Sequence, residues 1–299
     1  MSAERDARGG AYVRATYWVT LLEPTRNPRV RYTRAMGDAT KIAPTAHYTA
    51  YAWHVLGLPY AEHFATPLGR RLFRAYGLLE LPSKLRGRPS KLLRTLHNRH
   101  ALIDAELERL NPDMVVELGA GLSRRGLTFA LDHGVRYVEL DLPAVAAFKR
   151  RVLADRVPAS LLERAGERLR VLDADILAPG FRDELAKHLA GAERPVVVAE
   201  GVVGYFEAAQ RHAILSSIRG ALPHTGALLT DLRVRQGQAA STRVLRLGIL
   251  IATRGRGAAP SFADRKEVLA MLHGAGFTDV AELPALERDV LSTVWRSRP

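Results

Sequence analysis

The fold class follows from one short segment, residues 114–123, which read MVVELGAGLS. Its first five residues form a short apolar, β-branched run, which is typical of a buried parallel strand. Gly119 and Gly121 come next, and glycines permit backbone dihedrals that a Cβ atom would forbid. They also let a bound molecule lie against the main chain. We therefore expect a strand, a tight turn and a helix, with a ligand at the turn.

A second predicted strand ends on an acid, Asp141, within residues 137–143, YVELDLP. The acid follows the glycines by about 20 residues, the distance at which a carboxylate can accept hydrogen bonds from both hydroxyls of a ribose. Together the two strands predict a nucleoside site.

Two residues distinguish the possible cofactors. A dinucleotide fingerprint has a third glycine three residues after the second, but this chain has Arg124 there. Glu117, just before the turn, is a poor neighbour for a pyrophosphate and a suitable one for the positively charged end of a methionine. The pattern favours S-adenosylmethionine over a nicotinamide cofactor. The alternative is a glycine turn that binds no ligand.

The composition excludes several classes of function. The chain has no cysteine, which rules out disulfides, thiolate metal sites and the cysteine nucleophile used to methylate C5 of cytosine. The net charge is +13, but the arginines are spread along the chain, which does not favour a nucleic-acid surface. No apolar stretch approaches the ~20 residues of a membrane span, and no signal-peptide pattern is present. We expect a cytoplasmic protein without a metal site.

The chain divides into three predicted regions. Residues 1–40 are a basic arm, residues 41–90 a helical cap or lid, and residues 91–299 the cofactor-binding core. The segment 81–89, rich in proline, glycine and basic residues, marks the join between cap and core. A basic, mostly helical insertion is expected within the core at 233–257.

An arginine stands in the apolar stripe of a helix predicted over residues 90–111, for which Ser90 is the N-cap. Burying the guanidinium of Arg99 without a partner would cost several kcal/mol, so an anion should meet it. The favoured anion is the carboxylate of the cofactor. The alternatives are Asp104, Glu117, or a side chain that reaches water.

Two further strands are predicted to end beside the ligand. At the end of residues 169–176, Asp175 can accept a hydrogen bond from an exocyclic amine of the base, and Ile176 can cover the ring. Asp173 is the alternative residue for the role of Asp175. The apolar strand 195–199 leads to Glu200 at its carboxyl end, where ligands collect in parallel sheets.

The remaining strands complete the predicted sheet. Residues 202–206 lead from Glu200 into the space for an acceptor, and residues 227–232 form a fifth strand. Residues 277–283 and 290–295 are expected to form a hairpin, which gives the sheet an antiparallel partner.

These motifs resemble the leucine carboxyl methyltransferase family, which includes bacterial O-methyltransferases of polyketide pathways. The likeness rests on residues 116–123, on 135–143 with Asp-Leu-Pro after the second strand, and on Ala-Glu-Gly at 199–201 with Tyr205; it covers about residues 41–232. It implies an α/β class I methyltransferase fold, which is a Rossmann-like, seven-stranded sheet with an antiparallel last strand, plus a helical N-terminal cap.

The resemblance also implies roles for single residues. At the methionine end, Arg99 would hold the carboxylate, Gly119 would lie against the chain and Glu200 would contact the amine region. Asp141 would take the ribose, and Asp175 and Ile176 would flank the adenine.

The expected function is O-methylation of a small-molecule carboxylate or phenol in secondary metabolism, with S-adenosylmethionine as cofactor. The cap and the region after Tyr205 depart most from the family's protein-phosphatase enzymes, which favours a small acceptor. A carboxylate needs no base, whereas a phenol does. No residue of 202–206 can serve as that base, so a carboxylate is preferred. The candidate catalytic residues are Tyr205 and, in the cap, His47.

Two other functions stay open. An RNA or DNA methyltransferase would account for the charge, but the fourth strand ends in Ala-Glu-Gly and lacks the Asn/Asp-Pro-Pro-aromatic motif of amino methylation. A protein that binds the cofactor without catalysis is the third possibility. The sequence does not give the oligomeric state.

Overall fold

The computed structural model describes residues 36–79, 90–234, 262–287 and 290–299. These residues fall within one compact unit, Met36–Pro299. The expected arm before residue 36, the join at 81–89 and nearly all of the insertion at 233–257 lie outside the described residues.

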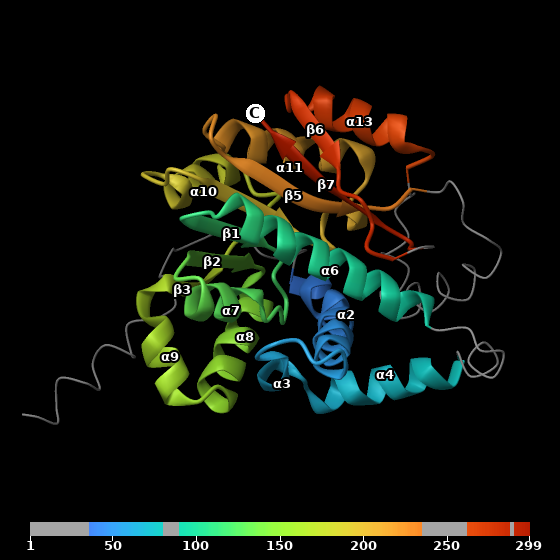
Figure 1. Cartoon of the computed structure of the whole chain (residues 1–299), viewed down its shortest axis with the longest axis vertical. Helices are drawn as coiled ribbons and strands as arrows, with labels where there is room; N and C mark the ends of the chain where they lie inside the picture. Colours follow the sequence, from blue (N-terminus) through green and yellow to red (C-terminus); the bar gives the residue numbers. More distant parts are fainter. Residues whose placement is uncertain (1–35, 80–89, 235–261, 288–289) are drawn as a thin grey trace, which may run out of the picture. The chain divides into compact units, whose positions relative to one another are not determined.

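A seven-stranded sheet runs through this unit in the order β3-β2-β1-β4-β5-β7-β6 (Figure 1). The first five strands are parallel, and β7 is antiparallel to both β5 and β6. This confirms the predicted class I methyltransferase sheet and its C-terminal hairpin. The strands are β1 Met114–Leu118, β2 Arg136–Asp141, β3 Leu169–Asp173, β4 Pro195–Ala199, β5 Ala227–Leu232, β6 Asp279–Glu282 and β7 Thr293–Arg298.

Helices cover both faces of the sheet, because successive residues of the buried strands point to opposite sides. Val115 packs into one core cluster, whereas Val116 and Leu118 pack into the other. One face carries α6 (Lys91–Leu110), α7 (Arg125–Asp132), α8 (Pro143–Arg156) and α9 (Ala159–Ala165); the other carries α10 (Phe181–Leu189), α11 (Ala208–Ala221) and α13 (Arg265–Gly274) (Figure 1). Short 3₁₀ turns are η1 (Gly166–Arg168) and η2 (Val203–Tyr205).

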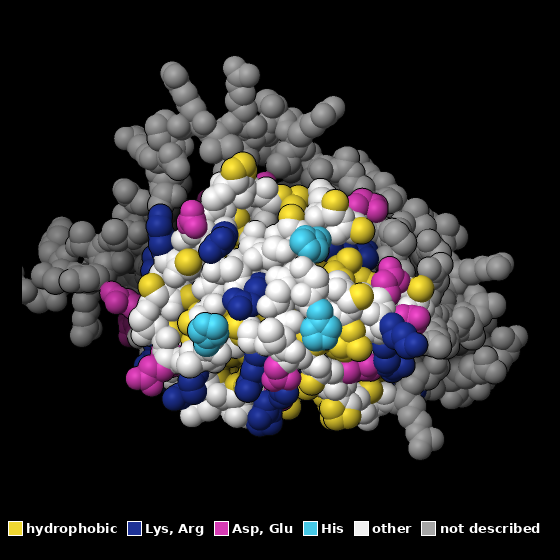
Figure 2. All heavy atoms as spheres, turned by 90° about the horizontal axis from the view of Figure 1, so that it is seen from above, with side chains coloured by type: hydrophobic (Ala, Val, Ile, Leu, Met, Phe, Trp, Pro, Cys, Tyr) yellow, Lys and Arg dark blue, Asp and Glu magenta, His cyan; other side chains and the backbone are white. Residues whose placement is uncertain are grey.

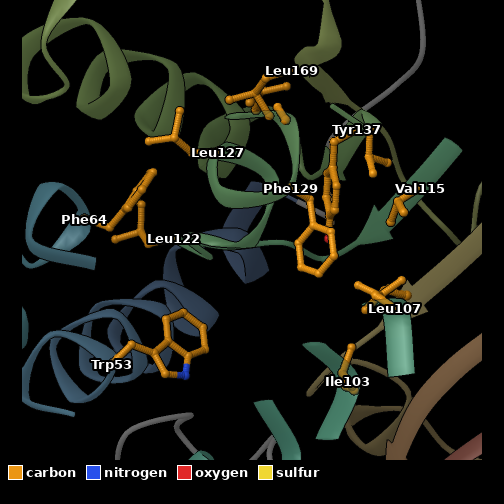
Figure 3. Packing of buried hydrophobic residues seen from close by; sticks show 14 of the residues in the cluster. Trp53, Phe64, Ile103, Leu107, Val115, Leu122, Leu127, Phe129, Tyr137 and Leu169 are labelled. Carbon is orange, nitrogen blue, oxygen red and sulfur yellow. The ribbon is translucent and has the colours of Figure 1, made fainter. Parts of the chain in front are cut away.

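Helix α6 begins and ends where its sequence predicts. The Oγ of Ser90 accepts a hydrogen bond from the backbone N–H of Leu93 at 3.2 Å, and Asn111 ends the helix in the left-handed conformation, with φ of 47°. Ile103 and Leu107 are fully buried in the first core cluster, which also contains Val115 of β1 (Figure 3), and α6 contacts β5 and β7. The apolar stripe therefore attaches α6 to the sheet. This packing places Arg99 at the carboxyl ends of β4 and β5.

Three helices lie in or next to the region expected to form a cap, and we refer to them as the cap: α2 (Met36–Val55), α3 (Ala61–Phe64) and α4 (Pro67–Leu79). α2 begins inside the range expected for the arm. Trp53 of α2 and Phe64 of α3 enter the same core cluster as α6 (Figure 3). Tyr48 and Tyr51 of α2 pack on Phe73 of α4, with ring centroids 5.6 and 5.4 Å apart. The cap is thus packed onto the core through aromatic side chains.

Figure 2 shows the face of the molecule that is at the top in Figure 1. Among the described residues of this face, lysine and arginine side chains are interspersed with acidic ones and do not form one basic patch. None of the described helices combines the length and apolar character that crossing a bilayer requires.

Truncating Leu107 should show how much the contact of α6 with the sheet stabilises the fold. Leu107→Ala leaves a cavity in the first cluster and should lower the free energy of unfolding by about 2–5 kcal/mol, measured by urea denaturation. The control is Leu286→Ala, because Leu286 is 59% exposed and its truncation should change stability little. Equal effects in the two variants would contradict the buried packing of α6.

Candidate active site

The glycine turn after β1 is closely covered on two sides. Gly119 and Gly121 have φ of +60° and +53°, a region that disfavours side chains. A Cβ at Gly119 would lie 2.3 Å from Cγ2 of Val202, and one at Gly121 would lie 3.1 Å from Cβ of Ala46. The cap helix α2 and the segment after β4 therefore meet at this turn.

Asp141 lies at the end of β2 and is bonded to the turn, so the structure brings together the three residues expected at the nucleoside. Its Oδ2 accepts from the backbone N–H of Gly121 at 2.7 Å, and its Oδ1 accepts from that of Leu142 at 2.7 Å. Burial raises the pKa of Asp141 and outweighs the two backbone donors, which act in the opposite direction. The carboxylate fixes the position of the turn relative to β2.

The acids after β3 differ in their surroundings. Asp173 stands opposite Asp141 in the strand register and accepts from Nη1 of Arg150 at 2.8 Å. Asp175 lies beyond the strand, where its Oδ1 accepts from the backbone N–H of Leu177 at 3.0 Å, and Ile176 packs against the second core cluster. Asp173 is thus held by α8, and Asp175 is not part of that pair.

Arg99 meets two carboxylates, Glu200 directly after β4 and Asp231 in the neighbouring strand β5. Its Nε donates to Oε1 of Glu200 at 2.8 Å and its Nη1 to Oδ2 of Asp231 at 3.3 Å. Burial lowers the pKa of Arg99, but the two carboxylates outweigh burial and raise it. In the described part of the chain, Arg99 therefore forms ion pairs with Glu200 and Asp231, whereas the partners considered from the sequence were Asp104 and Glu117.

Arg125, the first residue of α7, has no exposed surface and contacts three carboxylates. Its Nε donates to Asp104 at 2.6 Å, its Nη1 to Glu117 at 2.8 Å and its Nη2 to Glu200 at 2.6 Å. Burial lowers the pKa of Arg125, and the three carboxylates raise it well above its usual value. The planar guanidinium can satisfy all three acids because its donors point in different directions within one plane.

Glu117 is almost fully buried, and both of its oxygens are engaged. Oε1 accepts from Arg125, and Oε2 accepts from the hydroxyl of Tyr137 at 2.8 Å. Burial, followed by the charge of Glu117, raises the pKa of Tyr137 well above its usual value, so the phenol stays protonated as the donor. In this structure Glu117 holds Arg125 in place, and its expected contact with a methionine stays a prediction.

Arg124 and His100 complete the surroundings. Arg124 contacts Asp104 and donates to Oγ1 of Thr128 at 3.0 Å. His100 Nδ1 lies 2.9 Å from Oε2 of Glu200, and its ring stacks on Trp53 with centroids 4.4 Å apart. Burial and the charge of Arg125 lower the pKa of His100, so the imidazole is neutral at pH 7.

We call these ion-paired residues the ion network. It joins α6, β1, α7 and the carboxyl ends of β4 and β5. Its members are Arg99, Asp104, Glu117, Arg124, Arg125, Glu200 and Asp231.

Sequence reasoning missed Arg125, although one signal was present. Arg124 and Arg125 follow the glycine turn where α7 starts, and the positive end of a helix dipole is an unfavourable place for cations. Two arginines at that position indicate that nearby acids compensate them.

The candidate catalytic residues lie in different places. Tyr205, in η2, lies close enough to Arg99 for the two side chains to interact electrostatically. His47 contacts Oγ1 of Thr66 through Nδ1 at 2.8 Å and packs its ring edge on Phe148 of α8. Tyr205 thus lies at the methionine end of the expected cofactor site, whereas His47 is held in the interface between α2 and α8. No group of three or more metal-ligating residues occurs among the described residues.

Glu200 should make the stability of the protein sensitive to acid. Burial opposes ionisation, but His100, Arg125 and Arg99 hold the pKa of Glu200 well below its reference of 4.5. Ionised Glu200 therefore stabilises the fold above that pH, and this contribution is lost as the pH falls. The loss of unfolding free energy as the pH falls below about 4.5, for example between about pH 5 and pH 3, should be smaller in Glu200→Gln than in the parent.

The control for that measurement is Glu193→Gln, because Glu193 has a side chain that is 84% exposed. This variant should keep the acid dependence of the parent. An unchanged pH dependence in Glu200→Gln would show that Glu200 does not act as a buried anion.

Several solved methyltransferase structures are similar to this chain. The S-adenosylmethionine-dependent methyltransferase SibL has a TM-score of 0.50 and 19% identity, over 85% of this chain and 69% of that one. PigF with S-adenosylhomocysteine (SAH) has a TM-score of 0.49 and 15% identity, over 90% and 72%. Human N-acetylserotonin methyltransferase has a TM-score of 0.45 and 13% identity, over 89% of this chain and 68% of that one. At these identities, the likeness to SibL shows the fold alone.

A search of curated protein sequences finds no significant match. A sequence model described as leucine carboxyl methyltransferase matches residues 39–219, which is more than half of the chain. The family uses S-adenosylmethionine, which confirms the expected cofactor. The chain belongs to the leucine carboxyl methyltransferase family and is an S-adenosylmethionine-dependent methyltransferase of the class I fold.

Proposed function

We propose that this protein is an O-methyltransferase that transfers the methyl group of S-adenosylmethionine to a carboxylate of a small molecule. The observation that carries the choice of a carboxylate is the state of the acids and bases around Glu200. Glu200 and Asp231 are paired with Arg99, and His100 is buried beside Glu200.

A phenol would need a base that can take its proton, because its pKa is about 10. Among the described residues around Glu200, the acids are paired with guanidinium groups and make poor proton acceptors, and burial lowers the pKa of His100, which makes its imidazole a weak base. A carboxylate is already ionised at neutral pH and needs only alignment and desolvation. The arrangement therefore favours a carboxylate over a phenol.

The residues present fit the cofactor. The left-handed glycines contribute no side chains of their own to the turn, which lies between Ala46 and Val202, and Asp141 provides an acceptor beside it for a ribose. We assign the adenine to Asp175 and Ile176. We assign the methionine end of the cofactor to two oppositely charged residues at the carboxyl ends of the strands, Arg99 and Glu200. Gly119 lies beside it.

Bound S-adenosylmethionine supplies a methyl group that is already activated, so the protein's task is to position the acceptor and exclude water. Apolar groups lie next to both parts of the site. Ala46 of the cap and Val202 after β4 approach the glycine turn, and Trp53 of the cap stacks on His100 beside the ion network. Tyr205 follows in the same segment as Val202, and we assign it to orienting the acceptor.

Asp141→Asn should weaken the binding of S-adenosylmethionine at least tenfold in calorimetry. The substitution removes the negative charge, and hydrogen bonds to a charged acceptor contribute about 1.5–3 kcal/mol. Asparagine keeps one oxygen to accept a backbone N–H, so the fold should survive, and the unfolding free energy checks this.

A matched control is Asp173→Asn. It removes an acid at the same level of the neighbouring strand, where the partner is Arg150. Cofactor affinity should then change by less than about threefold, well under the loss that a charged hydrogen bond implies. Equal weakening in both variants would show a general charge effect and would contradict a ribose contact at Asp141.

The product identifies the acceptor. After incubation with methyl-labelled cofactor and a cell extract, label should enter the small organic fraction and should be released as methanol by alkali, because a methyl ester hydrolyses and an aryl ether does not. The rate should be nearly flat between about pH 6 and 9. An alkali-stable product formed at a rate that rises with pH would overturn the carboxylate, and label in nucleic acid would overturn the small acceptor.

A further inference from the structure

We propose that the ion network makes the site selective for the cationic cofactor over its product, and that Asp231 sets this selectivity. The inference rests on the proposed place of the methionine end. It adds a role for Asp231, which the assignment of cofactor-binding residues above does not include.

The ion network holds one more carboxylate than guanidinium groups. Its anions are Asp104, Glu117, Glu200 and Asp231, and its cations are Arg99, Arg124 and Arg125.

Neighbouring charged groups do not correct this imbalance. His100 is neutral, as described above. Lys149 lies 2.5 Å from Glu139, whose pKa burial raises to about 7, and Lys149 also interacts with the carboxylate of Asp141, so these groups together add no net positive charge. Tyr137 keeps its proton. Within the described residues, the network thus carries a formal charge of minus one.

The unbalanced charge lies towards Asp231. Asp104 contacts both Arg124 and Arg125, and Glu200 contacts both Arg99 and Arg125. Among the described residues, Glu117 and Asp231 each have one guanidinium partner. Glu117 accepts from Arg125 at 2.8 Å and also from Tyr137, whereas Asp231 has the longer contact, 3.3 Å from Nη1 of Arg99.

The position of Asp231 is fixed even though its ion pair is long. Its other oxygen accepts from the backbone N–H of Gly201, and its side chain is only 5% exposed. Asp231 lies on β5, next to the strand that leads to Glu200. The least neutralised acid of the network is therefore placed beside the expected methionine end.

A buried excess of negative charge is unfavourable unless a cation meets it. S-adenosylmethionine carries an ammonium, a carboxylate and a sulfonium group, so its net charge is plus one and it neutralises the network. SAH has an uncharged sulfur and a net charge of zero, so it leaves the excess uncompensated. The network should therefore bind the substrate form more tightly and favour release of the product.

Calorimetry on the full chain tests this with three probes: S-adenosylmethionine, SAH, and sinefungin, which has an ammonium in place of the sulfonium. The parent should bind both cationic probes at least tenfold more tightly than SAH. Asp231→Asn should bring the three affinities within about threefold of one another, because it weakens the two cations and leaves SAH nearly unchanged. The asparagine can still accept from Gly201.

Asp113→Asn is the charge-matched control. Asp113 lies at the other end of β1, where it pairs with Arg136, and removing its charge should keep the selectivity of the parent. Should Asp231→Asn fail to fold, Asp231→Glu, which keeps the charge, should retain the preference.

Two results would overturn the inference. One is a parent that binds SAH as tightly as the two cations, and the other is an Asp231→Asn variant that weakens all three probes equally. Both leave the cofactor assignment intact. A parent that binds none of the three probes would overturn the cofactor assignment together with this inference.

Discussion

The guanidinium of Arg125 is the interaction on which the rest of the site depends. It is fully buried and donates hydrogen bonds to acids of α6, β1 and the end of β4, so it connects the first two elements to Glu200, which lies 75 residues further along the chain than Arg125. Removing one partner of such a pair costs about 3–5 kcal/mol, because it leaves an uncompensated charge inside the protein. The arrangement of the strand ends is therefore fixed by electrostatics as well as by packing.

Two kinds of constraint meet around the glycine turn. On one side Asp141 binds the backbone of the turn, and on the other Ala46 and Val202 approach it so closely that a side chain would not fit at Gly119 without displacing Val202. Arg99 lies over Gly201 in a similar way, since a Cβ there would be 3.0 Å from its Nη2. The glycines thus act as places where other parts of the chain come close, and the ion network holds those parts in position.

Features governed by local pattern could be predicted from the sequence. Three such features depend on neighbours in the chain, and the structure has all three: the strand before Gly119, the acid Asp141 at the end of β2, and the helix N-cap at Ser90. The partners of Arg99 could not be predicted, because Glu200 and Asp231 are 101 and 132 residues away and meet it only through the strand order. The sequence identified the need for an anion but not which acids the topology supplies.

The position of β7 affects the order in which the sheet can be completed. β6 comes earlier in the chain but pairs only with β7, which lies between it and β5. During synthesis, β6 has no strand to join until residues 293–298 have left the ribosome, and until then the edge of β5 is unpaired. An unpaired strand edge can associate with other chains. The sheet is therefore completed only when β7, which follows β6 in the chain, enters between β6 and β5, and Trp295, buried between its neighbours, has to be placed at that step.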